Sequence, residues 1–243
     1  MTDTAWRTAR IELAAAFRGA ALYGLHEGIA NHFSLALPGR DDRFLLNPFG
    51  VHWTEITATD LLTLDTDGRT IDGDGEAELT AFQIHVGVHR AHADARCVLH
   101  THMPHATAIA CTADGFETRL SQTSMFFHGH VAYLDYGGLA EDDSEGDRIA
   151  KALIDGARVV LMKNHGVLVV GETVAHAWWD LFYLERACQV QVLAAQSGKL
   201  SPVDEATAQL TATQFGADRQ EHASAMFAAL RRQLDRELPG YDA

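Results

Sequence analysis

Residues 158–171 read RVVLMKNHGVLVVG, and this stretch decides the fold of the chain. Two apolar runs, each as long as a short strand, flank a polar turn that contains Gly166. Apolar runs interrupted by turn residues in this way are typical of two strands joined in a β-hairpin. We therefore predict a hairpin of two buried strands, with His165 in the turn between them.

The segments around this hairpin show strand and helix patterns in turn. Upstream, RCVLHTH at 96–102 is a compact strand pattern, and it follows a helix predicted at 76–92 from apolar residues at steps of three and four. Downstream, residues 173–198 predict a long helix with Thr173 as its N-cap. The other predicted strands cover 29–37, 43–46, 60–65 and 130–136, and the other predicted helices cover an opening segment ending near Tyr23, 104–112, 145–154 and 223–238.

This order of elements indicates the fold class. Strands followed by helices without a strict βαβ alternation favour a single α/β domain with a mixed sheet. A chain of 243 residues, 47% of them apolar, suits one domain with a large core. Because the chain is polar after Pro202, we predict one domain over 1–200. The remainder, 201–243, is predicted to be a C-terminal extension whose amphipathic helix packs at a subunit interface.

The charge balance excludes several classes of partner. The chain has 19 Lys and Arg against 33 Asp and Glu, a formal net charge of −14, which disfavours nucleic acid and anionic membrane surfaces. Charges such as Arg7 and Arg10 interrupt the N-terminal helix pattern, so we expect no signal peptide, and no stretch approaches a membrane span. The three cysteines lack metal-finger spacing and indicate reduced thiols. We expect a cytoplasmic protein that binds a small molecule.

Histidine is frequent, with 14 residues, and two His-x-His triplets occur, at His100/His102 and at His128/His130. At this frequency about one such triplet is expected by chance, so spacing alone proves little. The first triplet ends an apolar strand pattern, where residues two apart project from one face and can bind one ion. The second has a central glycine and precedes a strand, so its geometry is less constrained.

A third ligand to such an ion should come from another strand end. His165, in the turn of the predicted hairpin, is the best candidate. Neutral imidazoles bind divalent metals well. The alternative is that His100, His102 and His165 are polar residues that make ordinary hydrogen bonds at strand ends.

Five segments of the chain together resemble the class II aldolase/adducin family, over roughly Ala9 to Gly198. The matching segments are EGIANHFS at 27–34, NPFGVHWTEITATDLL at 47–62, VLHTHMPHATAIA at 98–110, VAYLDYGG at 131–138 and KNHGVLVVG at 163–171. The resemblance implies a three-layer αβα domain with a central mixed, largely antiparallel sheet. It also implies a homotetramer with active sites at subunit boundaries. One divalent metal ion per chain is implied, zinc in the first place with manganese or iron as alternatives, on His100, His102 and His165.

The resemblance breaks in the helix that precedes the histidine pair. The family's sugar-phosphate aldolases carry Pro-Ser-Ser-Glu there, and this motif falls on Glu78-Leu79-Thr80-Ala81. The serines that hold a substrate phosphate are absent, and a phosphate monoester needs several donors, so we predict a non-phosphorylated substrate. Ala81 takes the place of the catalytic glutamate and cannot move a proton. Glu78 lies one turn earlier and is a candidate for a substitute base. The alternative is that Glu78 is a solvated helix residue.

Losing this base favours one reaction over others. Decarboxylation needs no base to create its carbanion, because departing carbon dioxide leaves the electron pair behind. It needs an electron sink, which a metal with open coordination positions provides, and then a proton donor. We therefore predict a carbon–carbon lyase acting on a small hydroxy- or oxo-acid, with decarboxylation first. The alternatives are an aldolase, a non-catalytic adducin-like binding module, and iron-dependent oxygenation.

Four residues are predicted to assist catalysis: His32, Gln122, His128 and Tyr133. His32 falls where the family approaches its substrate, and capping of a strand is the alternative. Gln122 and His128 precede the strand at 130–136, which we expect to border the pocket. Tyr133, like Tyr136, has a phenol that can donate a proton, although tyrosines in strands often pack. His85, one turn after Ala81, is expected either to face the site or to hold a residue of the site in position.

Overall fold

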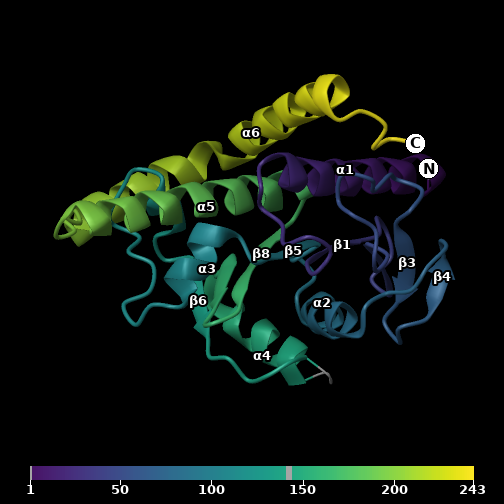
Figure 1. Ribbon diagram of the computed structural model, residues 1–243, viewed down its shortest axis with the longest axis horizontal. Coiled ribbons are helices and arrows are strands. Elements are labelled where there is room, and N and C mark those ends of the chain that lie inside the picture. Colours follow the sequence, from purple (N-terminus) through teal and green to yellow (C-terminus); the bar gives the residue numbers. More distant parts are fainter. Residues whose placement is uncertain (1, 141–143) are drawn as a thin grey trace.

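The structure, a computed structural model, describes residues 2–140 and 144–243 (Figure 1). Its centre is an eight-stranded sheet in the order β4-β3-β2-β1-β5-β8-β7-β6, in which β6 and β7 pair in parallel and all other pairs are antiparallel. The predicted mixed, largely antiparallel sheet is therefore confirmed. The strands are β1 (His32–Ala36), β2 (Arg43–Leu46), β3 (Leu62–Asp65), β4 (Thr70–Asp72), β5 (Cys97–Thr101), β6 (Val131–Leu134), β7 (Val159–Met162) and β8 (Gly166–Gly171).

Helices cover both faces of this sheet and give the predicted three layers. One face is covered by α1 (Thr2–Leu22), α3 (Pro104–Ala110), α5 (Val174–Ser197) and α6 (Glu205–Glu237), and the other by α2 (Leu79–Ala91) and α4 (Ser144–Ala152) (Figure 1). Two short 3₁₀ turns, η1 (Ser124–Phe127) and η2 (Ile154–Gly156), complete the elements. No helix in the described ranges has the length and apolarity needed to cross a membrane.

The alternation of side chains along β5 determines on which side of the sheet the functional residues lie. Cys97 and Leu99 pack in the core under α1 and α5, whereas Val98 packs in the core under α2 and α4. Successive residues of a strand point to opposite faces. His100 therefore continues the Val98 face and points toward the α2/α4 layer.

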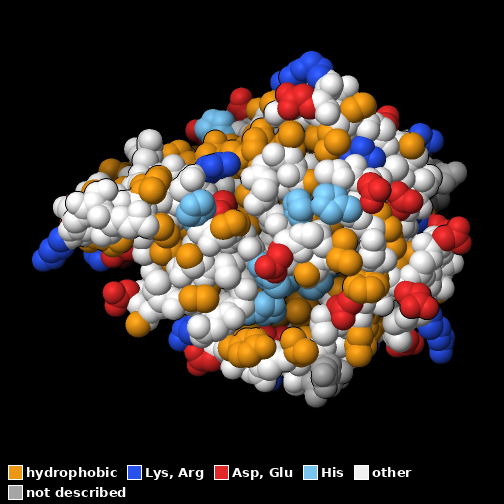
Figure 2. Space-filling model, viewed as in Figure 1, with side chains coloured by type: hydrophobic (Ala, Val, Ile, Leu, Met, Phe, Trp, Pro, Cys, Tyr) orange, Lys and Arg blue, Asp and Glu red, His pale blue; other side chains and the backbone are white. Residues whose placement is uncertain are grey.

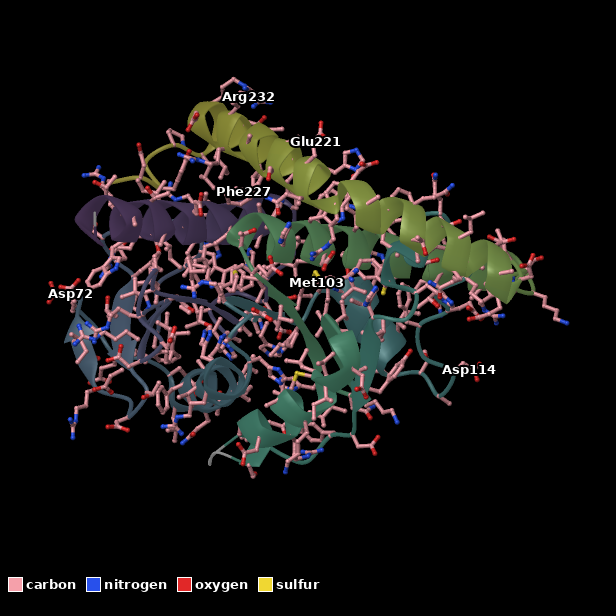
Figure 3. All side chains as sticks on the ribbon, turned by 180° about the vertical axis from the view of Figure 1, so that it is seen from behind. Asp72, Met103, Asp114, Glu221, Phe227 and Arg232 are labelled. Atoms are coloured by element: carbon pink, nitrogen blue, oxygen red, sulfur yellow. The ribbon has the colours of Figure 1, made fainter. Side chains whose placement is uncertain are left out.

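The C-terminal helix differs from the prediction in its length. It begins at Glu205 rather than at Ala223, with the Asp204 carboxylate accepting a hydrogen bond of 2.8 Å from the Thr207 amide. The first half was missed because its residues are mostly polar and its apolar stripe is sparse. Figure 3 shows Phe227 on the inner side of the helix, where it is buried against the chain's own core. Packing at a subunit interface stays a prediction.

A close contact between two glycines sets the distance between α2 and α4. A Cβ atom added at Gly87 would lie 2.5 Å from the carbonyl carbon of Gly146. We expect Gly87→Ala to lower the free energy of unfolding by about 1–3 kcal/mol, because the two backbones must separate. Gly216→Ala in α6 is the matched control, since a Cβ there meets nothing within 4 Å, and it should raise stability by about 0.5–1 kcal/mol. Urea unfolding of both variants measures this, and equal stability of Gly87→Ala and the wild type would contradict the packing argument.

Candidate metal centre

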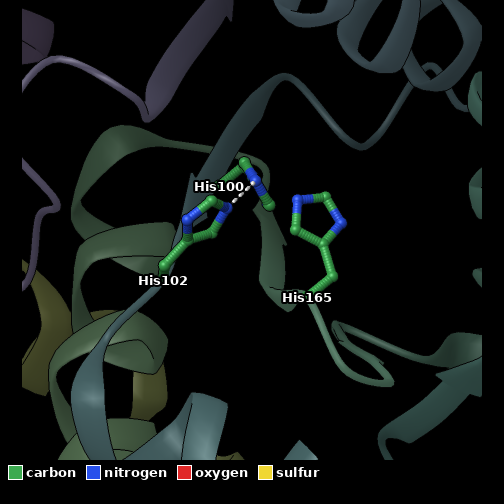
Figure 4. Close-up of side chains that lie close together, drawn as sticks. All are labelled: His100, His102 and His165. Atoms are coloured by element: carbon green, nitrogen blue, oxygen red, sulfur yellow. Dashed lines mark hydrogen bonds between the residues drawn. The ribbon is translucent and has the colours of Figure 1, made fainter. Parts of the chain in front are cut away.

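Three histidines from two strand ends meet at one point. His100 lies in β5, His102 follows that strand, and His165 lies in the turn between β7 and β8. One ring nitrogen from each lies within 4.8 Å of the others, and Nε2 of His100 is 3.2 Å from Nε2 of His102. Figure 4 shows the three rings surrounding a common space. Among the described residues, no other group of three metal-binding side chains has this arrangement.

The second ring nitrogen of two of these histidines is held by an acceptor. Nδ1 of His100 donates to the carbonyl of Val167 at 3.0 Å, and Nδ1 of His102 donates to the Glu27 carboxylate at 2.5 Å. A neutral imidazole has one N–H and one lone pair. The two Nε2 atoms therefore face each other as lone pairs, an arrangement that a cation between them stabilises. The donor set fits a divalent metal ion.

The electrostatics of the site favour neutral rings. Burial and the neighbouring histidines lower the pKa of His100 well below its ordinary value. Burial, followed by the proximity of His102, lowers the pKa of His165 to about 4. Metal binding requires deprotonated ring nitrogens, so at neutral pH these two ligands lose no affinity to proton competition.

Glu27 contacts the candidate site and was not among the residues predicted from the sequence. Its carboxylate orients His102, and its own amide donates to Oδ1 of Asn31 at 2.8 Å. Asn31 also receives a hydrogen bond of 3.4 Å from the amide of His102. The only available signal was the position of Glu27 inside the matched segment 27–34. A carboxylate behind a metal-binding histidine fixes the ring and raises its basicity.

The histidine trio opens into a cavity of about 340 Å³. Its wall includes, besides the trio, His32, Thr80, Tyr136, Glu145 and Asn164. A second cavity of about 250 Å³ shares Ala30, His32 and Thr80 with the first and adds Ile29 and Phe49. Figure 2 shows histidine side chains reaching the surface in the middle of one face, with hydrophobic side chains around them. No Lys or Arg among the described residues lines either cavity.

Of the four predicted catalytic residues, only His32 lies at this cavity. Its ring stacks on that of His100 with 4.8 Å between centroids. The residues of β6 on either side of Tyr133 pack under α4, on the face of the sheet to which His100 points. Tyr133 therefore points to the opposite face, where its hydroxyl hydrogen-bonds the backbone of Phe116. Tyr136, beyond the end of β6, lines the cavity instead, 6.2 Å from His165 between ring centroids.

Gln122 and His128 lie near α6. Gln122 lines a separate cavity beside Phe215 and His222, and His128 is held between Thr118 and Glu205 at 2.9 Å each. A single subunit therefore does not bring these two residues, or Tyr133, to the histidine trio. Their catalytic role stays a prediction, and it now requires a second subunit.

Two carboxylates, Glu78 and Glu145, lie at the walls of the two cavities. Ala81 is buried in α2, and Glu78 is the N-cap of that helix, accepting a hydrogen bond of 2.8 Å from the Ala81 amide. Glu78 is thus a capping residue, which neither of the two predicted readings described. Glu145 of α4, which the sequence reasoning did not single out, brings a buried carboxylate to the cavity wall and pairs with Arg148 at 2.5 Å.

Comparisons with known proteins agree with this architecture. Residues 11–192 match the family described as class II aldolase and adducin N-terminal domain. A crystal structure of an aldolase II superfamily protein from Pseudomonas syringae is 35% identical, covers 100% of this chain and 98% of its own, and superposes with a TM-score of 0.93.

Two relatives from Streptomyces are also similar. Decarboxylase NovR of Streptomyces niveus is 35% identical, over 78% of this chain and 70% of its own. A protein of Streptomyces roseochromogenus named 4-hydroxy-3-prenylphenylpyruvate oxygenase/4-hydroxy-3-prenylbenzoate synthase is 36% identical, over 78% of this chain and 69% of its own. Because the family's description matches residues 11–192 and the histidine trio is in place, this chain belongs to the class II aldolase and adducin family.

Proposed function

We propose that this protein is a metal-dependent carbon–carbon lyase that decarboxylates a small, non-phosphorylated hydroxy- or oxo-acid. The observation that carries the proposal is the histidine trio at the wall of one cavity, with Ala81 in the wall of the adjoining cavity, at the position where the resemblance implies a catalytic glutamate. Family membership alone leaves the reaction open, since the family includes aldolases and adducins.

Each residue of the site has a proposed role in this reaction. His100, His102 and His165 would hold the ion, with Glu27 and the Val167 carbonyl fixing two of the rings. A divalent metal on three imidazoles keeps open positions and supplies a Lewis acid for charge that develops on an adjacent oxygen. His32 borders the same space and orients the substrate, and Tyr136 can return a proton to the carbanion carbon. We propose zinc as the ion, with manganese and iron as alternatives.

The walls of the cavities suggest the substrate class. A phosphate monoester requires charged or multiple donors, and no Lys or Arg of the described residues lines either cavity. Ile29 and Phe49 give the second cavity an apolar side suited to an aromatic or aliphatic group. The name of the NovR relative, a decarboxylase, supports the same reaction class.

We also propose a cytoplasmic homotetramer with sites at subunit boundaries.

Two alternative reactions have specific support. Retro-aldol cleavage must remove a proton from a hydroxyl, and the imidazole of His32 beside His100 is a group that can take it. Oxygenation by an iron form is supported by the name of the Streptomyces roseochromogenus relative. A non-catalytic binding module, as in adducins, is the remaining alternative.

The test uses protein loaded separately with zinc, manganese and iron(II), beside chelator-treated protein. Each form is incubated with 2-hydroxy-, 3-hydroxy- and oxo-acids, including aromatic ones, while carbon dioxide, aldehyde and oxygen consumption are measured. Metal-dependent carbon dioxide release without oxygen uptake is the expected result. Aldehyde formation alone would establish an aldolase, and oxygen uptake an oxygenase. Full metal occupancy without turnover on any compound would favour the binding module.

A further inference from the structure

Another cavity, of about 310 Å³, lies at the opposite end of strands β5, β7 and β8 from the histidine trio. Its wall includes Ala95, two residues before β5, and Gly171, the last residue of β8. Arg158, which precedes β7, and Arg219 of α6 also line this cavity, and we call it the arginine cavity. It shares no lining residue with the two cavities beside the trio. A ligand bound here would therefore lie apart from the candidate metal centre.

A single carboxylate holds both arginines. Oδ2 of Asp180, on α5, accepts a hydrogen bond of 3.1 Å from Nε of Arg158 and one of 2.7 Å from Nη2 of Arg219. Oδ1 of the same carboxylate has no partner in the described ranges. Because both contacts use one oxygen, neither guanidinium forms the two parallel bonds to a carboxylate that its fork allows. In the described part of the chain, the Nη1 groups of both arginines make no hydrogen bond and remain available as donors.

The charges in this cluster do not balance. Two guanidinium groups pair with one buried carboxylate, which leaves one positive charge in excess. The side chains of Arg158 and Arg219 are only 21% and 20% exposed, and a charge held mostly out of water is costly unless a partner compensates it. The other acidic residues of the wall, Asp94 and Glu172, are exposed and form no ion pair with any described residue. An anion that reaches the two Nη1 groups would supply the missing partner.

The wall of the arginine cavity indicates which anion fits. A carboxylate offers two oxygens in one plane, the geometry that the guanidinium fork matches. Asp94 and Glu172 repel a second negative charge, so a dicarboxylate or a phosphate dianion is disfavoured. Three buried apolar residues of the same wall suit a short hydrocarbon chain: Ala95, Leu153 and Val170. The volume is at the lower end of the range of small-molecule sites, about 300–1,000 Å³.

We propose that the arginine cavity binds a small monocarboxylate, with its carboxylate on the Nη1 groups of Arg158 and Arg219 and its hydrocarbon part against the apolar wall. The two arginines come from different layers, the start of β7 and the covering helix α6, and Asp180 of α5 fixes the position of both. The site needs no metal ion and is independent of the proposed lyase reaction. The alternative is that the three charged residues only join α5, α6 and the sheet.

Binding is measured on the full-length, chelator-treated protein at pH 7.5. Butyrate is the probe and butyramide is its uncharged counterpart of the same size, and saturation-transfer difference NMR at constant ionic strength follows both. We expect a saturable butyrate signal and no saturable butyramide signal. Succinate and inorganic phosphate, added as competitors, should displace butyrate only weakly. Absence of a saturable butyrate signal would overturn the proposal, and succinate binding as tight as that of butyrate would overturn the assignment to monocarboxylates.

Matched variants locate the bound butyrate. Arg219→Gln removes donors and one positive charge, and it should weaken butyrate binding at least about tenfold, because a charge-assisted hydrogen bond is lost. Arg232→Gln makes the same change at an exposed position of α6 (Figure 3) and should leave the affinity unchanged. Glu172→Gln removes a repelling charge at an exposed position, so it should tighten the binding of butyrate and tighten that of succinate more.

Unchanged butyrate affinity in folded Arg219→Gln, or in Glu172→Gln, would show that butyrate binds elsewhere and would overturn the proposal. If Arg219→Gln does not fold, Glu172→Gln decides, since it alters an exposed side chain that pairs with no described residue. These outcomes are separable from the proposed reaction, because the protein is measured without metal. A protein that binds butyrate in this way but releases no carbon dioxide would refute the decarboxylase alone, and the reverse result would refute the arginine cavity as a binding site alone.

Discussion

Replacing His100 by alanine is expected to remove the bound metal from the protein and reduce turnover to background. The residue is buried and its ring is anchored to the Val167 carbonyl, so alanine removes one of the three fixed nitrogens of the candidate site. Losing a group behind a ligand costs about 10–100-fold in metal affinity, and losing the ligand itself should cost more. Elemental analysis after dialysis, followed by competition with a chromophoric chelator, measures both occupancy and affinity.

Two further variants make this experiment quantitative. Glu27→Gln keeps an acceptor beside His102 but removes its charge, and we expect affinity about 10–100-fold below the wild type. His222→Ala removes an exposed histidine of α6 and should leave affinity unchanged. Equal metal content in His100→Ala and the wild type would show that the ion binds elsewhere and would remove the basis for the proposed lyase.

The meeting of the three histidines could be predicted from the sequence because it depends on strand geometry within two short segments. His100 and His102 share a strand end, and His165 lies in a turn that the pattern at 158–171 already indicated. The β5–β8 pairing, which places His100 beside Leu168, brings the two strand ends together. A hairpin and an adjacent strand are enough to assemble the three rings.

The residues behind and around the trio were harder to predict, because they depend on contacts between distant segments. Glu27 reaches His102 across 75 positions of sequence, in a loop without periodic pattern. No sequence pattern distinguished Tyr133 from Tyr136 as a residue of the cavity. The orientation of β6 in the sheet decides that Tyr136 lines the cavity and Tyr133 does not. Glu145 reaches the cavity because α4 packs on α2 through two glycines, a contact that no local pattern indicates.

Acidification is expected to destabilise the metal-free protein strongly between pH 7.5 and 5.5. His85 and His89 are neutral in the folded state because burial lowers the pKa of each, to about 3 for His89. In the unfolded chain both titrate near pH 6.5. Below that pH the unfolded state binds more protons, so the free energy of unfolding falls as pH falls toward the folded pKa.

The magnitude is large relative to the stability of a typical domain. At pH 5.5 the neutral His89 alone costs about 1.4 kcal/mol, an upper value because this ring keeps some contact with solvent. His85 acts in the same direction, and His32 and His100, whose pKa values burial also lowers, add to it. Their sum is a substantial part of a total stability of about 5–15 kcal/mol.

Urea unfolding in the presence of a chelator at pH 7.5, 6.5 and 5.5 measures this loss without the added effect of metal release. His89→Gln should reduce the pH dependence by about 1 kcal/mol over this range, because the amide does not titrate. His222→Gln, at an exposed position, should leave the pH dependence as it is in the wild type. If stability stayed constant from pH 7.5 to 5.5, the buried histidines would have to take up protons in the folded protein to the same extent as in the unfolded chain.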